Sequence, residues 1–289
     1  MPVELILNVV LSGVLTGLVY GLMALGLSVI FGVVRVVNFA HGELMTLAMY
    51  GAVALFQGFA LDPLLAVPLL ALAFFALGYL LQSTLIQRFV TRPEHSQFLL
   101  LLAVAVCLAN AQLMLFGPDA RNAALDYQLD SVELGPLLLD VPRLYAGGAA
   151  LCASLAMFAF FRHSRVGKAI RACADNHRGA QVVGLPIRRL YALTFGLGCA
   201  CVAVAGCALT LLVDVTPALG PAYTLLGFVI VIVGGLGSML GALLAGLLIG
   251  VSEALAGLFI TPSAKSMVSF GLLILVLLLR PQGLLGRRA

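Results

Sequence analysis

Long runs of apolar residues, separated by short polar segments, dominate the sequence. Most runs come close to the roughly 20 residues that an α-helix needs to cross a bilayer. The pattern therefore predicts an all-α polytopic membrane protein with about eight transmembrane helices. The runs are Leu5–Val34, Phe39–Ala60, Leu64–Phe89, Phe98–Phe116, Leu144–Phe161, Leu190–Val213, Tyr223–Leu258 and Met267–Leu279.

The run Tyr223–Leu258 is too long for one crossing and too short for two. The sequence GGLGS interrupts it and leaves a first piece of about 12 residues, roughly 18 Å of helix. We therefore predict a broken or half helix near residues 223–238, followed by a full helix. Irregular backbone at membrane depth is tolerated only where protein buries it or where it lines a cavity. The candidate functional residues at this break are Gly234, Gly235, Gly237 and Ser238.

Composition supports a membrane protein. The chain has 289 residues, of which 62% are hydrophobic and 10% are charged. A soluble domain carries about 25% charged residues, so these few charges do not suffice for a water-facing surface. The six cysteines form no CxxC pair and show no metal-ligand spacing, so we expect packing roles for them. The first run has no basic segment before it and no small-residue cleavage site after it, so we expect a retained span.

The charges of the loops predict the orientation of a single transmembrane domain, residues 1–289. The loop 162–189 is rich in Arg and Lys, whereas the loop 117–143 is rich in Asp and Glu. The positive-inside rule places the first loop in the cytoplasm and the second outside. Alternation then places Arg35 in the cytoplasm and the N-terminus outside. The net charge of +4 lies in loops, so it reports topology and does not indicate nucleic-acid binding.

Glycines at intervals of four residues mark helix faces that approach a neighbour closely. In lipid, packing through small residues replaces hydrophobic burial as the force between helices. Such faces pack either within the chain or against a second subunit, and the spacing favours neither. The glycines are Gly13, Gly17 and Gly21 in the first run, and Gly237, Gly241, Gly246 and Gly250 late in the chain.

A glycine-rich span runs into an N-x-A-H-G segment in the stretch GLMALGLSVIFGVVRVVNFAHGELMTLAMYGA (Gly21–Ala52). This stretch resembles the Liv-type (leucine/isoleucine/valine) permease subunits of bacterial ABC importers. Three later segments resemble the same family in the same order, and the length resembles its H-type more than its M-type subunit. The resemblance implies a fold like that of type II ABC importer permeases. The later segments are Ile170–Gly198, Val233–Gly246 and Arg280–Arg287.

The resemblance also implies a location, partners and a function. The location is the bacterial inner membrane, and the function is transport of branched-chain or related amino acids. Related permeases carry urea, amides or small aromatic acids, and these substrates stay open. The partners are an M-type permease subunit, two ATP-binding subunits, an external substrate-binding protein and membrane lipid. No P-loop motif occurs in this chain, so ATP and magnesium are expected on the partner subunits and no cofactor here.

Within the basic loop, Val166, Ile170, Cys173, His177 and Ala180 recur at spacings of four and three. This stripe predicts a short amphipathic helix, ended by Pro186. The resemblance implies that it docks on the ATP-binding subunits, although the family's leading glutamate is missing. The alternative is a basic segment lying against anionic headgroups. The candidate coupling residues are Lys168, Ile170, Arg171, Ala174, His177, Gly179, Gly184 and Pro186.

The polar stretch after the first span has two interpretations. Asn38 is expected at the cytoplasmic interface, with His41 and Glu43 two to five residues deeper. In the first interpretation Asn38 opens a helix and Glu43 sits near its positive N-terminus. In the second, all three belong to the gate of the translocation path, together with the Gly234–Ser238 break. No catalytic residues and no metal site are expected, because H-G-E lacks the second histidine of HExxH.

Two other classes of protein remain as alternatives. An ion-coupled secondary transporter usually needs carboxylates inside the membrane, and Glu253 is the clearest candidate. An intramembrane enzyme needs a convergent catalytic set, which the sequence does not supply.

Overall fold

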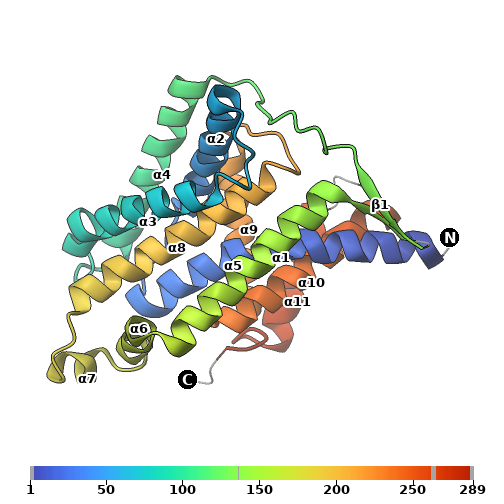
Figure 1. The fold of residues 1–289 in the computed structure, drawn as a ribbon. Coiled ribbons are helices and arrows are strands. Elements are labelled where there is room, and N and C mark those ends of the chain that lie inside the picture. The colour runs from blue at the N-terminus through green and yellow to red at the C-terminus, as the bar shows by residue number, and fades with distance from the viewer. Residues whose placement is uncertain (1–2, 136, 262–264, 287–289) are drawn as a thin grey trace.

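The computed structural model describes residues 3–135, 137–261 and 265–286. Within these ranges the chain forms eleven α-helices, one 3-10 turn and one β-hairpin (Figure 1). The helices are α1 (Val3–Val34), α2 (His41–Phe59), α3 (Val67–Thr84), α4 (Glu94–Phe116), α5 (Val141–His163), α6 (Arg165–Asp175), α7 (His177–Val182), α8 (Ile187–Leu209), α9 (Leu219–Gly234), α10 (Met239–Phe259) and α11 (Lys265–Leu279), with the 3-10 turn η1 at Ile86–Arg88.

Every predicted apolar run contains a helix, and the long run splits into α9 and α10 at the GGLGS break. Among the described residues, six helices are long and apolar enough to cross a membrane, and α9 and α11 are shorter apolar helices. The half helix α9 has 16 residues because it begins at Leu219, before the predicted start. The predicted all-α membrane fold is therefore confirmed.

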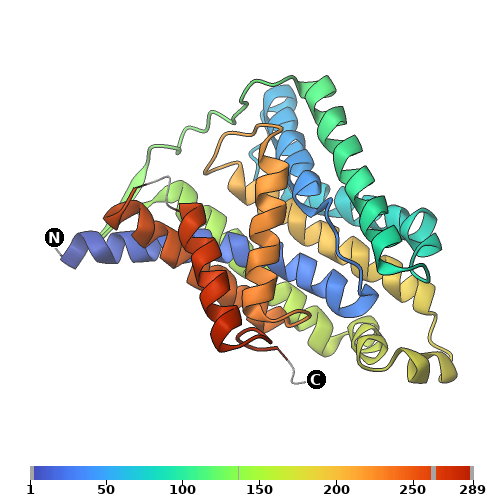
Figure 2. The same cartoon turned by 180° about the vertical axis from the view of Figure 1, so that it is seen from behind.

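Helix α1 lies at the centre of the bundle. Helices α5 and α8 pack on one side of it, and α9 and α10 pack on the other (Figures 1 and 2). In the most apolar 18-residue stretches of α1 and α8, 83% of the residues are buried inside the protein, whereas in that of α4 only 17% are buried. Helix α4 is therefore peripheral, and its apolar side chains are left for lipid or for another subunit.

The glycine stripes pack α1 directly against α10 within this chain. A Cβ atom on Gly13 would lie 2.8 Å from the Cα of Val251, and one on Gly17 would lie 2.9 Å from the carbonyl oxygen of Gly246. Gly21 also faces Gly246 across this seam. Because no side chain fits at such distances, the two backbones touch. This glycine face therefore packs within the chain and not against a second subunit.

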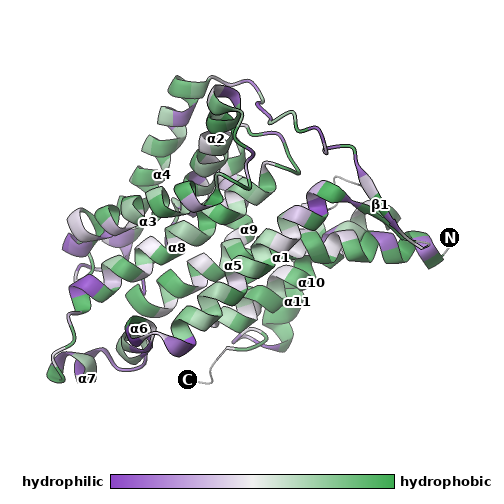
Figure 3. Ribbon diagram, in the orientation of Figure 1, coloured by the Kyte–Doolittle hydropathy of each residue, from purple (hydrophilic) through white to green (hydrophobic). Residues whose placement is uncertain are grey.

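The loops group at two ends of the bundle as their charges predict. At one end, the Tyr127 hydroxyl donates to Asp62 Oδ2 at 2.6 Å, and the backbones of Arg121 and Val215 pair. This loop also forms a hairpin that the sequence did not predict, β1 (Ser131–Leu134) with β2 (Leu137–Asp140). At the other end lie the polar helices α6 and α7 (Figure 3). The compartment that each end faces remains a prediction from charge.

Candidate functional site

The segment between α1 and α2 folds back along α1. Helix α1 ends at Val34, and Arg35 turns the chain with a left-handed φ of 59°. The chain then returns far enough for His41 Nε2 to lie 2.9 Å from the carbonyl oxygen of Met23. Roughly 18 Å of helix separates Met23 from Arg35 at 1.5 Å per residue. The expectation that His41 and Glu43 lie only two to five residues below the cytoplasmic interface is therefore wrong, because α2 begins deep inside the bundle.

Buried polar contacts hold the start of α2 in place. Asn38, His41 and Glu43 are each at most 2% exposed. The Thr224 hydroxyl accepts from the Gly42 amide at 2.9 Å, and Gln112 Nε2 donates to the Glu43 carbonyl oxygen at 3.0 Å. Neither partner was predicted, because both are polar residues within otherwise apolar helices. A polar side chain inside a membrane protein needs a hydrogen-bond partner, so a polar residue in an apolar helix could have predicted such a contact.

The capping interpretation needs a correction. Ala40, not Asn38, precedes the first residue of α2, and the Asn38 side chain instead accepts from the Ala40 amide at 3.1 Å. Glu43 does lie in the first turn, and its carboxyl group rests on Gly220 at the start of α9. A Cβ atom on Gly220 would overlap that carboxyl group. The start of α2 is therefore fitted against α9.

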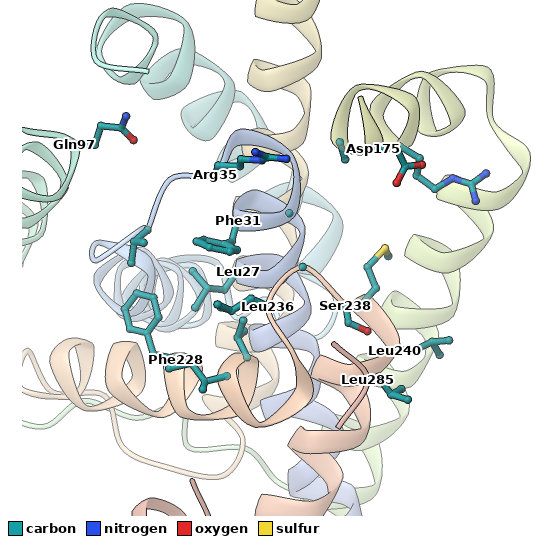
Figure 4. A pocket seen from close by; sticks show the side chains of 18 of the residues that line it. Leu27, Phe31, Arg35, Gln97, Asp175, Phe228, Leu236, Ser238, Leu240 and Leu285 are labelled. Atoms are coloured by element: carbon teal, nitrogen blue, oxygen red, sulfur yellow. The ribbon is translucent and has the colours of Figure 1, made fainter. Parts of the chain in front are cut away.

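A cavity of about 1720 Å³ opens beside this segment. Arg35, Val37 and Phe39 line it, while the residues between them, such as Asn38, are buried in the core. This alternation is the two-residue period of an extended chain. On α1, Leu27 and Phe31 precede Arg35 at intervals of four and continue the same wall (Figure 4).

The other walls come from α4, α5, α6, α9, the start of α10, the GGLGS break and the tail. Of the predicted gate residues, Gly237 and Ser238 line the cavity, whereas Asn38, His41, Glu43, Gly234 and Gly235 are not among its lining residues. The buried polar residues therefore support the wall from behind. The charged residues and the histidine that line the cavity are Arg35, Glu94, His95, Lys168, Arg171 and Asp175.

The GGLGS break is covered by the tail of the chain. Gly235 and Gly237 adopt φ angles of 102° and 79°, a region that favours glycine. The Leu284 amide donates to the Val233 carbonyl oxygen at 2.8 Å, and the Leu285 amide donates to that of Gly234 at 3.0 Å. The tail therefore satisfies carbonyl groups that the end of α9 leaves free. The last residues of the basic tail, 287–289, lie outside the described residues.

The predicted coupling segment consists of two helices rather than one. Asn176 leaves the helical conformation between α6 and α7, and its Oδ1 accepts from the Gly179 amide at 2.9 Å. Ser164 caps α6 in the same way through the Gly167 amide. Because asparagine favours a helix N-cap over a helix interior, the break has a local cause. After α7, Gly184 turns the chain with a φ of 80° ahead of Pro186.

The apolar stripe of this segment packs against the chain itself. Ile170 is fully buried and Cys173 is 2% exposed, and burial raises the pKa of the Cys173 thiol. Val166 is 40% exposed, and His177 is exposed with its Nδ1 3.0 Å from the Tyr191 hydroxyl. The prediction that this stripe faces a partner is therefore wrong. The opposite face carries the exposed side chains, among them Lys168, Arg171, Val182 and Val183.

The remaining buried carboxylate lies apart from the cavity. Glu253 of α10 accepts from the Ser269 hydroxyl of α11 at 2.5 Å. Within the ranges that the structure describes, no three His, Cys, Asp or Glu side chains converge as metal ligands. The cysteines in those ranges are all free thiols.

Comparison with known proteins places the chain in a family. The model of the family described as "Branched-chain amino acid transport system / permease component" matches residues 9–277. The permease protein BraD of Pseudomonas aeruginosa is 31% identical over 97% of this chain and 96% of its own length. LivH of Salmonella typhimurium is 32% identical and LivH of Escherichia coli K12 is 31% identical, each over 96% of this chain and 94% of its own length. No solved structure matches the chain. The chain therefore belongs to the permease-component family of branched-chain amino acid transport systems, and it is a multi-pass protein of the inner membrane.

Proposed function

We propose that this chain forms part of the path by which an ATP-driven importer moves branched-chain or related amino acids into the cell. The names of its relatives, high-affinity branched-chain amino acid transport permeases, support this substrate class. The observation that carries the proposal is the cavity of about 1720 Å³, which meets the buried N-x-A-H-G segment. A permeant solute needs such a route between helices, and the wall here is mainly apolar with a few charged groups.

The proposed assembly contains two ATP-binding subunits, and the exposed face of α6 and α7 is the proposed contact of this chain with them. Val182 and Val183 are 87% and 74% exposed at the tip of a polar segment. The charges of this segment place it in the cytoplasm, where the membrane does not cover these side chains. Exposed apolar side chains in such a place are typical of interaction surfaces. ATP and magnesium would bind on those partner subunits, because this chain has no P-loop sequence.

Movement at this contact has a short route to the cavity. Ile170 and Cys173 anchor α6 in the chain, while Lys168 and Arg171 of the same helix line the cavity. A push on α6 by closing ATP-binding subunits would therefore shift one wall of the cavity directly. A second, M-type permease subunit and an external binding protein complete the proposed assembly, with the binding protein at the acidic 117–143 end.

Reconstituted complexes test this function. Leucine uptake into proteoliposomes should require ATP, the ATP-binding subunits and the loaded binding protein, and the purified chain alone should hydrolyse no ATP. Val182→Asp should reduce uptake by weakening assembly, whereas Gln57→Asp, at an exposed position near the end of α2, lies outside the proposed contact and serves as the control. Uptake that follows a proton or sodium gradient without ATP would reject the proposal in favour of a secondary transporter.

Orientation is tested by thiol labelling in a background without native cysteines. Asp126→Cys should react with an impermeant reagent from outside intact cells, and Asn176→Cys should react only after permeabilisation. The opposite pattern would place α6 and α7 outside and would reject their contact with cytoplasmic ATP-binding subunits.

A further inference from the structure

Three phenylalanine side chains from distant parts of the sequence meet in the cavity. Phe39 follows the extended segment, Phe98 belongs to α4 and Phe228 belongs to α9, and all three line the cavity. The ring centroids of Phe39 and Phe98 lie 4.7 Å apart at 83°, and those of Phe39 and Phe228 lie 5.0 Å apart at 45°. These are the edge-to-face and tilted arrangements that aromatic rings prefer. We call these three residues the aromatic cluster.

The buried polar contacts hold the aromatic cluster in place. The Thr224 hydroxyl donates to the Phe39 carbonyl oxygen at 3.3 Å and accepts from the Gly42 amide. Asn38, next to Phe39, ties its own side chain to the Ala40 amide. The backbone on both sides of Phe39 is thus bonded to groups that are almost completely buried. Such bonding preorganises a side chain that points into a cavity, and this gives the N-x-A-H-G segment a role that capping alone does not.

The cavity wall changes character along the segment. Arg35 and Phe39 are four residues apart in extended chain, about 13 Å at 3.3 Å per residue, with Val37 between them. In Figure 4 the side chains of Leu27 and Phe31 lie between those of Arg35 and Phe228. This wall therefore has Arg35 at one end and the aromatic cluster at the other. A solute with an apolar group gains most by placing that group at the aromatic end, because this removes apolar surface from water.

We propose that the aromatic cluster is the contact site for the apolar side chain of the transported amino acid. This inference rests on the proposed function and sharpens it, because it selects amino acids with apolar side chains over urea and simple amides. Urea has no apolar group to bury against the three rings. Arg35, at the other end of the wall, attracts the carboxylate of the same solute as it moves along the cavity.

Protection of an introduced thiol tests the site directly. The assembled complex, in a background without native cysteines, carries Phe39→Cys or, as a second reporter, Phe98→Cys, whose parent side chain is already 39% exposed. Free leucine should slow modification of both thiols by a small maleimide about threefold at a concentration of twice its dissociation constant. Urea at the same concentration should leave both rates unchanged. Asp126→Cys, exposed in the acidic loop and absent from the cavity lining, is the control whose rate leucine should not alter.

Each other result overturns the site. Equal protection by leucine and urea, or protection by neither, shows that the aromatic cluster does not contact the apolar side chain. Thiols that lose all reactivity when the second permease subunit binds, with or without leucine, show that this subunit fills the cluster. ATP-driven leucine uptake by the unmodified complex is measured in parallel. Intact uptake without protection rejects the aromatic cluster alone, whereas absent uptake rejects the proposed function.

Discussion

Two polar segments of this chain, 35–43 and 165–183, have opposite surroundings. In the first, the polar side chains of Asn38, His41 and Glu43 are buried. In the second, the apolar side chains of Ile170 and Cys173 are buried and most polar ones are exposed. Both segments interrupt apolar runs in the sequence. The difference shows that polar residues between apolar runs mark either a surface loop or a buried network, and that partners on other helices decide between them.

The largest expected effect is in the second segment. Ile170→Asp would place an unpaired carboxylate at a fully buried position and should lower the stability of the protein by about 4 kcal/mol. The thermal unfolding midpoint of the purified protein in detergent measures this loss. Val182→Asp, at an 87% exposed position on α7, is the control and should unfold like the parent. A stable Ile170→Asp protein would show that the stripe is free to face a partner after all.

The stability of the protein should be sensitive to the size of the side chain at Gly42, in the first segment. A Cβ atom on Gly42 would lie 2.5 Å from the Thr224 hydroxyl oxygen and would overlap the Gly220 carbonyl oxygen. Gly42→Val should therefore separate α2 from α9 and cost about 3 kcal/mol, measured by the same unfolding midpoint. Gly58→Val is the matched control on the same helix, because a Cβ atom there meets nothing within 4 Å. Equal midpoints for the two variants would contradict the close fit of α2 on α9.

A pair of histidines compares the two segments directly. His41 is fully buried against the Met23 carbonyl oxygen, whereas His177 is exposed beside Tyr191. We expect His41→Ala to cost about 2 kcal/mol through the lost hydrogen bond and the cavity that it leaves. His177→Ala should cost at most about 0.5 kcal/mol, as is usual for a surface substitution. Similar losses for both, in parallel unfolding measurements, would remove the distinction between the segments.

The smallest expected effect concerns the break between α6 and α7. Asn176→Ala removes the side chain that accepts from the Gly179 amide and should cost about 1 kcal/mol. Asn176→Asp keeps an acceptor at the cap and should restore most of this stability. Hydrogen exchange of the α7 amides provides a local measurement, since faster exchange in the alanine variant alone assigns the loss to α7. Unchanged exchange there would show that the cap contributes nothing.

The pattern of apolar residues was enough to predict the helices, the half helix before GGLGS and the loops that share each end. These features follow from local properties, because a bilayer requires about 20 apolar residues per crossing and closely spaced glycines allow the positive φ angles that end a helix at the GGLGS break. The motif residues also identified the family. The hairpin at Ser131–Asp140 escaped prediction because the flanking acidic residues hid a short pairing of strands.

Only the tertiary structure decided which faces are buried and what the polar residues contact. The stripe with Ile170 looked ready for a partner, yet this chain covers it, because a helical period shows that a face is apolar and not which surface covers it. Gln112, Thr224 and the tail at Leu284 reach the site from distant parts of the chain. The aromatic cluster likewise joins α4 and α9 to the extended segment. Such contacts depend on how helices pack in three dimensions, which spacing along one helix does not determine.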